Sequence, residues 1–303
     1  MGKRLWDLGL VLLAGACAFG AGGLWLAVTG TLLLEALPAL QAFGVGFLLG
    51  QVWNPVQGQY GIGPPVWGTL VTTGLALALA VPLGLGVAIG LAESWPWLPS
   101  RWRVFGAALV DLLAAIPSVV YGLWGIFVLI PALRLWQKGQ PQLFGETVIG
   151  PSVGVASLVL AIMLVPTIAT VARSSLQQVP QEYRWAAAAL GATRWEQLLG
   201  IVLPAARVGI GGGILLALAR ALGETMAVTM LIGNAHRISG SLWQPGSTIP
   251  SLLANQFAEA QGMQVAALMY AALVLLGVTV AMHLLARGVI PAGIDSGREN
   301  PLG

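Results

Sequence analysis

Long apolar stretches, separated by short polar segments, dominate the hydrophobic pattern along this chain. A helix needs roughly 20 consecutive apolar residues to cross the hydrocarbon core of a bilayer. Six stretches meet that length: Leu8–Leu34, Val66–Ala92, Val104–Ile130, Gly150–Ala172, Val208–Ile232 and Val265–Ala286. The pattern therefore predicts an all-α integral membrane protein with six transmembrane helices.

The composition supports this class of protein. Of the 303 residues, 57% are hydrophobic and only 8% are charged, against roughly 25% charged residues in average soluble proteins. The net charge of +3 comes without any run of Lys or Arg, which excludes the basic footprint of a nucleic-acid-binding protein. The single cysteine, Cys17, can form neither an intrachain disulfide nor a metal cluster. We expect membrane lipid around the chain, and no nucleic acid, metal or cofactor.

The distribution of positive charge predicts the orientation. Ten of the 14 Lys and Arg residues fall on one side of the six stretches, three fall on the other, and Arg220 lies inside the fifth. Because cytoplasmic loops carry the excess of Lys and Arg, both termini should be cytoplasmic. The segments expected outside are Asn54–Pro65, Arg134–Glu146 and Gly233–Gly262. On the last of these, we expect His236 and Arg237 to be solvated.

The longest cytoplasmic segment runs from Arg173 to Arg207 and predicts two short helices joined by a turn. Ala186–Leu190 favours a helix strongly. Gly191 can adopt a positive φ without steric cost, which suits a turn. A second amphipathic stretch follows, and Pro204 starts the next element. We interpret the segment as a helix–glycine–helix elbow with a small-residue face that can dock against another protein.

This elbow resembles the EAA loop of ABC-importer permeases, which reads Glu-Ala-Ala, three residues, Gly, nine residues and Ile-x-Leu-Pro. The matching positions are Ala186, Ala187, Gly191, Ile201, Leu203 and Pro204. Trp185 occupies the position of the motif's Glu, and Glu182, one helical turn earlier, can stand in for it on the same face. The resemblance implies that the elbow docks into a cytoplasmic ATPase.

The chain itself is not expected to hydrolyse ATP. A phosphate-binding Walker A loop needs Gly-Lys followed by Ser or Thr. The only lysines, Lys3 and Lys138, are followed by Arg and Gly. We therefore expect a transport subunit without catalytic residues, and ATP hydrolysis by a partner.

Two charged residues, Arg220 and Glu224, lie within the fifth apolar stretch. A charge at the middle of the bilayer costs roughly 2.5–3.5 kcal/mol on insertion scales. Their spacing of four places them on one face of a helix, where they can neutralise each other. Two interpretations stay open. Arg220 can guide a small anion while Glu224 tempers its charge, or the pair can be a structural bridge that fixes the helix rotation.

Other polar residues in the apolar stretches also have two interpretations. Thr69, Thr72 and Thr73 can line a polar path or bond their own backbone. Asp111 is expected to pair with nearby Arg101 or Arg103.

From about Trp53 to Arg287 the chain resembles the PstC family of phosphate ABC transporter permeases. The stretches that carry the resemblance include Gly68-Thr-Leu-Val-Thr-Thr, Val81-Pro-Leu-Gly-Leu-Gly, Ile116-Pro-Ser-Val-Val-Tyr-Gly, Arg220-Ala-Leu-Gly-Glu-Thr-Met-Ala-Val and Ile232-Gly-Asn. Chains of the sister PstA permease read Ala-Pro where this chain has Met226-Ala. The resemblance implies a type I (MetI-like) permease in the bacterial inner membrane that imports inorganic phosphate.

The same resemblance implies partners, a domain plan and a path. The partners are a PstA-like second permease, a dimer of ATP-binding subunits and a periplasmic phosphate-binding protein. Residues 1–60 hold the first span and its periplasmic connection, residues 61–290 the permease domain with its coupling loop at about 177–207, and residues 291–303 a cytoplasmic tail. The residues implied for the translocation path are Arg220, Glu224, Thr225 and Asn234.

Two alternatives to phosphate import stay open. The chain can be the permease of an importer for another oxyanion such as molybdate, sulfate or phosphonate, because these would share the elbow. An ion-coupled secondary transporter or channel, which needs no ATPase, is the alternative from another class.

Overall fold

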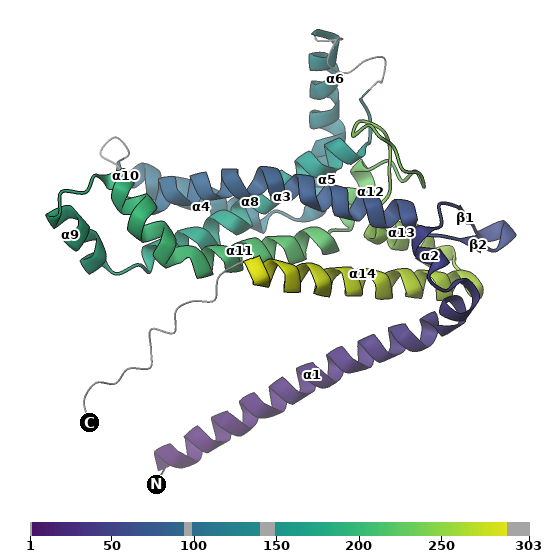
Figure 1. Ribbon diagram of the computed structural model, residues 1–303, viewed down its shortest axis with the longest axis horizontal. Helices are drawn as coiled ribbons and strands as arrows, with labels where there is room; N and C mark the ends of the chain where they lie inside the picture. The colour runs from purple at the N-terminus through teal and green to yellow at the C-terminus, as the bar shows by residue number, and fades with distance from the viewer. Residues whose placement is uncertain (1, 94–98, 140–148, 290–303) are drawn as a thin grey trace.

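The computed structural model describes residues 2–93, 99–139 and 149–289, and it is built almost entirely from helices (Figure 1). The expected tail at 291–303 lies outside these residues. Within the described part, six helical segments are long and apolar enough to cross a membrane, which confirms the predicted class. They are Gly9–Phe43, Gly63–Ala92, Ser118–Gly139, Val153–Gln177, Arg194–Gly223 and Met263–Gly288.

Helices α3 (Gly63–Ala92) and α8 (Val153–Gln177) form the most extensive helix pair. Their backbones approach closely because Gly84 has no side chain: a Cβ there would lie 2.9 Å from the Cβ of Ile168. Helix α11 (Leu203–Gly223) packs against both of them. Small residues at such contacts let membrane helices gain van der Waals packing, since no hydrophobic force drives association within lipid.

The first and last spans pack together away from this centre. Helix α1 (Gly2–Phe43) meets α14 (Met263–Val289) near its own C-terminal end and diverges from the bundle toward its start (Figure 1). A second apolar cluster forms where α2 (Gly46–Leu49) and α13 (Ile249–Gln256) join them. The rings of Phe47 and Tyr270 stack there at 4.5 Å. Most described side chains in the first half of α1 are exposed and apolar, as a lipid-facing helix requires.

A small hairpin lies at the same end as α2 and α13 (Figure 1). Strand β1 (Trp53–Asn54) pairs antiparallel with β2 (Gln59–Tyr60) around the 3₁₀ turn η1 (Pro55–Gln57). His236, from the loop after α12, is half-buried against this hairpin, and its Nε2 lies 2.9 Å from the Gly61 carbonyl oxygen. The expectation of a solvated His236 was wrong, because the loop folds back onto the hairpin. Arg237 is exposed, as expected.

The third span differs from the prediction of one helix over Val104–Ile130. Helix α4 (Ser100–Ala115) ends before Pro117, and a second helical run continues as α5 (Ser118–Trp124), the π-helical turn η2 (Gly125–Leu129) and α6 (Ile130–Gly139). The residue before a proline avoids the helical region, and Ile116 is accordingly extended with ψ of 129°. Residues 140–146 of the expected outer loop lie outside the described residues.

The fifth span is also interrupted. Helix α11 ends at Gly223, and two residues separate it from the short helix α12 (Met226–Leu231), where the sequence predicted a continuous Val208–Ile232. The following segment, expected as an outer loop, contains α13 and the 3₁₀ turn η4 (Phe257–Glu259). At the opposite end of the molecule, α9 (Gln181–Ala189), α10 (Arg194–Gln197) and the π-turn η3 (Leu198–Val202) precede α11.

Candidate functional site: the elbow and the broken fifth span

The predicted elbow is present, and Gly191 makes its turn. Helix α9 ends as Gly191 takes a φ of 83°. Its amide donates to the Ala188 carbonyl at 3.0 Å, and the Ala192 amide donates to the Ala187 carbonyl at 3.0 Å. A left-handed residue that returns the chain onto the last carbonyls is a common helix ending. The expected positive φ is thus confirmed.

The second arm of the elbow begins with a reciprocal cap. The Thr193 hydroxyl accepts from the Glu196 amide at 3.4 Å, and the Thr193 amide donates to Oε2 of Glu196 at 2.7 Å. A capping interaction of this kind stabilises a helix start by about 1 kcal/mol. The arm then runs through Ile201 in the π-turn into α11, where Leu203 and Pro204 are the first residues. The elbow is therefore locally defined at both of its bends.

An apolar cluster seats the elbow on the ends of the spans. Its buried members come from α3, α8, the segment before α9, the second arm of the elbow and α11: Ala88, Ala172, Leu176, Val179, Leu198, Val202, Ala206 and Ile210. Ala187 also faces inward and is buried, whereas Ala186 and Glu182 are exposed. The two alanines of the motif therefore have different surroundings, one buried within the elbow region and one on its exposed face.

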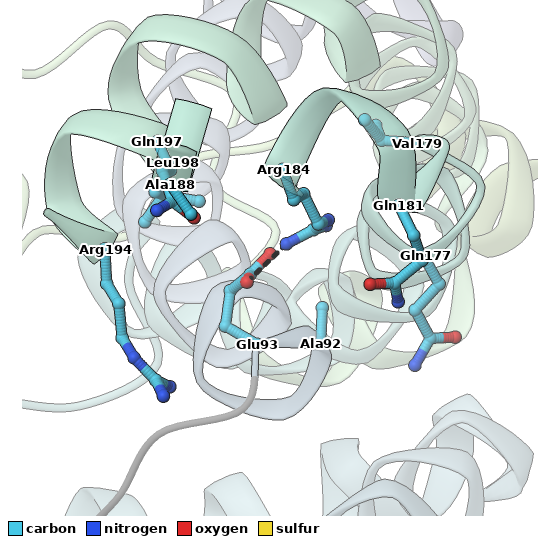
Figure 2. A pocket seen from close by; sticks show the side chains of 10 residues that line it. All are labelled: Ala92, Glu93, Gln177, Val179, Gln181, Arg184, Ala188, Arg194, Gln197 and Leu198. Carbon is cyan, nitrogen blue, oxygen red and sulfur yellow. Dashed lines mark hydrogen bonds and ion pairs between the residues drawn. The ribbon is translucent and has the colours of Figure 1, made fainter. Parts of the chain in front are cut away.

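An ion pair joins the elbow to the end of α3. Nη1 of Arg184 lies 2.6 Å from Oε2 of Glu93, with the two side chains only 19% and 16% exposed. Figure 2 shows them pointing toward each other across a cleft of about 420 Å³. Nη2 of Arg184 also donates to the Leu176 carbonyl at 3.1 Å, and Arg103 donates to the Glu93 carbonyl at 3.2 Å. These bonds connect α9 with α3, α8 and the start of α4.

The outer surface of the elbow exposes large apolar side chains. They are Tyr183, Trp185, Leu190, Trp195 and Leu199. Leu190 beside the turn is 89% exposed, and Trp185, at the position of the motif's Glu, is 67% exposed. Exposed large apolar groups that gather on one short segment are typical of protein interaction sites. The surface is therefore suited to docking against a partner.

The two charged residues of the fifth span do not share a helix face, so the expected neutralising pair was wrong. Glu224 follows the last helical residue and is extended, with ψ of 117°. Its Oε1 accepts from the Ala227 amide at 3.3 Å at the start of α12, where the helix dipole favours a negative charge. Arg220 instead donates from Nη1 to the Thr167 hydroxyl of α8 at 3.4 Å. Among the described residues, no ion pair joins Arg220 and Glu224.

The other two path candidates bracket α12. The Thr225 hydroxyl donates to the Gly223 carbonyl at 3.1 Å. Asn234 follows α12 with a φ of 52°, and its Nδ2 donates to the Thr229 carbonyl at 2.8 Å. The structure thus brings Glu224 and Thr225 together at the helix break and places Asn234 beyond the far end of α12.

A small polar cavity lies beside the break, and the sequence did not reveal it. It measures about 10 Å³, close to the space that one water molecule needs. Glu224 lines it together with Thr72 and Thr73 of α3. The Thr72 hydroxyl is buried without a partner. Thr69, in contrast, donates to the Pro65 carbonyl at 2.8 Å and accepts from the Ile249 amide at 2.9 Å, so the backbone interpretation holds for Thr69 alone.

Asp111 also has a different neighbour from the one expected. Its Oδ1 accepts from the Thr170 hydroxyl of α8 at 3.4 Å. No ion pair with Arg101 or Arg103 is present among the described residues. The break at Pro117 leaves α4 lying along α8, which brings Asp111 to Thr170 instead.

Comparison with known families gives one matching model, "Binding-protein-dependent transport system inner membrane component", over residues 80–291. Among curated proteins, the chain is 41% identical to the phosphate transport system permease protein PstC of Haemophilus influenzae, over 86% of this chain and 85% of that one. It is 42% identical to PstC of Pasteurella multocida, over 87% and 85% of the two chains. A probable PstC of Methanocaldococcus jannaschii is 32% identical over 78% of each chain.

Solved structures support the fold alone. The MetNI methionine ABC transporter in an inward-facing conformation contains a chain that matches with a TM-score of 0.59 and 17% identity, over 79% of this chain and 98% of that one. A bacterial alginate ABC transporter in complex with its pentasaccharide-bound periplasmic protein matches with a TM-score of 0.59 and 16% identity, over 96% and 98% of the chains.

Proposed function

Since the chain belongs to the binding-protein-dependent transport system inner membrane components, and within them to the PstC permeases, we propose that it imports inorganic phosphate as one permease subunit of an ABC transporter. The observation that carries this proposal is the identity of 41% to a phosphate permease over 86% of the chain. The aligned region spans nearly the whole relative, so it includes both the elbow and the broken fifth span.

The elbow is the proposed site of energy coupling. Its exposed apolar surface, together with Glu182 and Ala186, docks against one subunit of a cytoplasmic ATPase dimer, while Ala187 and Leu198 seat it on the spans. Movement of the ATPase then displaces α9, and the Arg184–Glu93 pair passes the displacement to α3. Gly191, Ile201, Leu203 and Pro204 maintain the bend that makes the two arms one rigid unit.

The broken fifth span is the proposed translocation site. Arg220 supplies a positive charge within the membrane, and Glu224 and Thr225 lie at the helix break four and five residues further on. The interruption leaves backbone groups and the Glu224 carboxylate beside a small polar cavity, and interrupted helices at membrane depth commonly form solute sites. Asn234, beyond α12, extends this path toward the outer face.

The proposed assembly has a fixed orientation. The elbow faces the cytoplasm, because ten of the 14 Lys and Arg residues lie on its side of the spans. Both termini share that side, and the hairpin at Trp53–Tyr60 faces the periplasm of a bacterial cell. A PstA-like permease completes the path, and a periplasmic phosphate-binding protein delivers the solute.

Transport by the reconstituted complex tests this function. Proteoliposomes that contain the chain, a PstA-like permease and the ATPase should take up labelled phosphate only with ATP and with the loaded binding protein. Omitting this chain is the matched control. If sulfate, molybdate or phosphonate is taken up faster than phosphate, that oxyanion is the substrate in place of phosphate. Uptake without any ATPase would identify a secondary transporter or channel instead.

A further inference from the structure

A groove opens between α4 and the end of α8, on the elbow side of the molecule. It encloses about 490 Å³, and Arg103, Asp111, Arg173 and Gln177 line it. Its apolar wall consists of Leu91 from α3 and of Val104, Ala107 and Ala108 from α4. Two arginines and one aspartate therefore line a cleft with apolar sides, and these side chains give the cleft a net positive charge.

Arg173 is the feature of this groove that lacks an explanation in the fold. Its side chain is half-buried, yet neither an ion pair nor a hydrogen bond involves it among the described residues. Arg184 on the same side is held by a carboxylate and a carbonyl. A guanidinium that lines a cleft and has no protein acceptor is suited to an anionic ligand, above all to phosphate oxygens.

A line of polar contacts connects the groove with the broken fifth span. Arg220 donates to Thr167 of α8 at 3.4 Å. Thr170 lies one turn further along the same helix and donates to Asp111 at 3.4 Å. Asp111 and Arg173 then share the groove. These polar residues follow one another at helical spacing along α8, the most buried of the spans, and they lead from the charge inside the membrane to the elbow side.

We propose that this groove is a phosphate-group site, with Arg173 as its principal ligand and Arg103 beside it. The ligand is a tetrahedral oxyanion, supplied either by inorganic phosphate leaving the path or by the headgroup of an anionic phospholipid. The row of polar residues that leads from Arg220 along α8 to the groove favours inorganic phosphate. Asp111 keeps such a site weak, and a conduction pathway needs sites from which the ion can leave. This inference deepens the proposed function and rests on it for the inorganic phosphate source.

Phosphate binding to the intact complex tests the proposal without transport. The complex, free of nucleotide and of binding protein, is placed in phosphatidylcholine nanodiscs, and inorganic phosphate is titrated while its ³¹P line width is followed. In Arg173→Gln we expect about tenfold weaker binding, because one charge-assisted hydrogen bond to phosphate contributes roughly that much. Arg207→Gln is the matched control, since Arg207 is an exposed arginine on the same side that does not line the groove.

A second arm distinguishes the two sources of the phosphate group. The same variants are prepared in phosphatidylcholine mixed with phosphatidylglycerol, and retained lipid is counted by native mass spectrometry. If Arg173→Gln loses phosphatidylglycerol and leaves the ³¹P titration unchanged, the ligand is the lipid headgroup. If Arg173→Gln binds phosphate and retains phosphatidylglycerol as well as Arg207→Gln does, and Arg173→Lys assembles normally, the proposal is overturned. Failure of ATP-driven phosphate uptake in the wild type would instead refute the proposed function, because these titrations need no transport.

Discussion

Arg184 and Glu93 are 91 residues apart in sequence, yet they form a largely buried ion pair with 2.6 Å between Nη1 and Oε2. Arg184 belongs to the elbow and Glu93 ends α3, the helix whose other half carries Thr72 and Thr73 beside the helix break. The pair therefore links the expected docking surface for an ATPase with the helix that lines the small polar cavity. Through this ion pair, a displacement of α9 would pull directly on the end of α3.

We predict that Glu93→Gln uncouples transport from ATP hydrolysis. The substitution leaves Arg184 without its charged partner, which costs about 1–3 kcal/mol for a group of this kind. Phosphate uptake per ATP hydrolysed should fall several-fold, whereas ATPase activity persists. Simultaneous measurement of uptake and phosphate release from ATP in proteoliposomes gives this ratio.

The matched control for this variant is Glu259→Gln, because Glu259 is an exposed glutamate in η4 at the opposite end of the molecule. It should keep the wild-type ratio. Exchanging the charges, with Glu93→Arg and Arg184→Glu together, should restore part of the coupling. An unchanged ratio in Glu93→Gln would show that the pair transmits nothing.

Gly191→Val is expected to abolish uptake by distorting the elbow. A β-branched residue at a φ of 83° is strained by at least about 1–2 kcal/mol. Gly200→Val is the control on the same arm, since Gly200 has a negative φ and open space around its Cβ position. Cross-linking between the elbow and the ATPase should fall in Gly191→Val alone. Full uptake by Gly191→Val would argue against the elbow as the coupling element.

Periodicity and local motifs predicted the spans and the elbow, because both depend on neighbouring residues. The apolar run at Gly63–Ala92 and the turn at Gly191 needed no tertiary information. The prediction for the third span was wrong although Pro117 was visible, since a membrane helix can continue through a proline, as α3 does at Pro82. Whether the helix ends before Pro117 or continues through it depends on how α4 packs along α8, which is tertiary information.

The site was less accessible than the fold. The spacing of Arg220 and Glu224 predicts a shared face only if the helix continues, and it ends at Gly223. The Glu93–Arg184 pair joins separate segments, and no spacing rule connects them. Thr72 becomes notable only because packing buries its hydroxyl without a partner. Such relationships arise from tertiary packing between distant segments, and local spacing rules applied to a single sequence do not reveal them.

The separation of Arg220 from Glu224 predicts independent contributions to stability. In a double-mutant cycle with Arg220→Gln and Glu224→Gln, the coupling energy in phosphate-free buffer should stay below about 0.5 kcal/mol. Unfolding of the complex in mixed micelles measures it. The comparison cycle pairs Arg220→Gln with Thr167→Val, whose side chains do touch, and should give a larger coupling. A strong coupling between Arg220 and Glu224 would indicate that they form a structural bridge.

The same variants separate transport from assembly. Because Arg220 lies within the membrane and its hydrogen bond to Thr167 is long at 3.4 Å, Arg220→Gln should leave the permease pair assembled. Uptake should fall by at least about tenfold, as expected when a charge that guides an anion is removed. Size-exclusion chromatography of the complex checks assembly. Loss of the complex together with uptake would favour a structural role.

We predict that His236 makes the contact between the loop after α12 and the hairpin sensitive to acid. Burial lowers the pKa of His236 below its ordinary value of 6.5, although the hydrogen bond to the Gly61 carbonyl opposes this shift. The neutral ring can donate from Nε2 to Gly61 and leave the buried Nδ1, which has no partner, without a proton. Protonation would place a second N–H in a site without an acceptor. A lowered pKa in the folded state means that the contact is fully stable above about pH 6.5 and weakens as the pH falls through the folded pKa.

We therefore expect faster hydrogen exchange at 53–62 and 233–246 on acidification below pH 6.5, after correction for intrinsic exchange rates. In His236→Gln this dependence should disappear, because the glutamine amide does not titrate in this range. His283→Gln is the matched control, since His283 is the other histidine of the chain and lies on α14, where it contacts the Thr279 carbonyl. It should keep the wild-type profile. Equal pH profiles for the wild type and His236→Gln would mean that protonation of His236 does not control this contact.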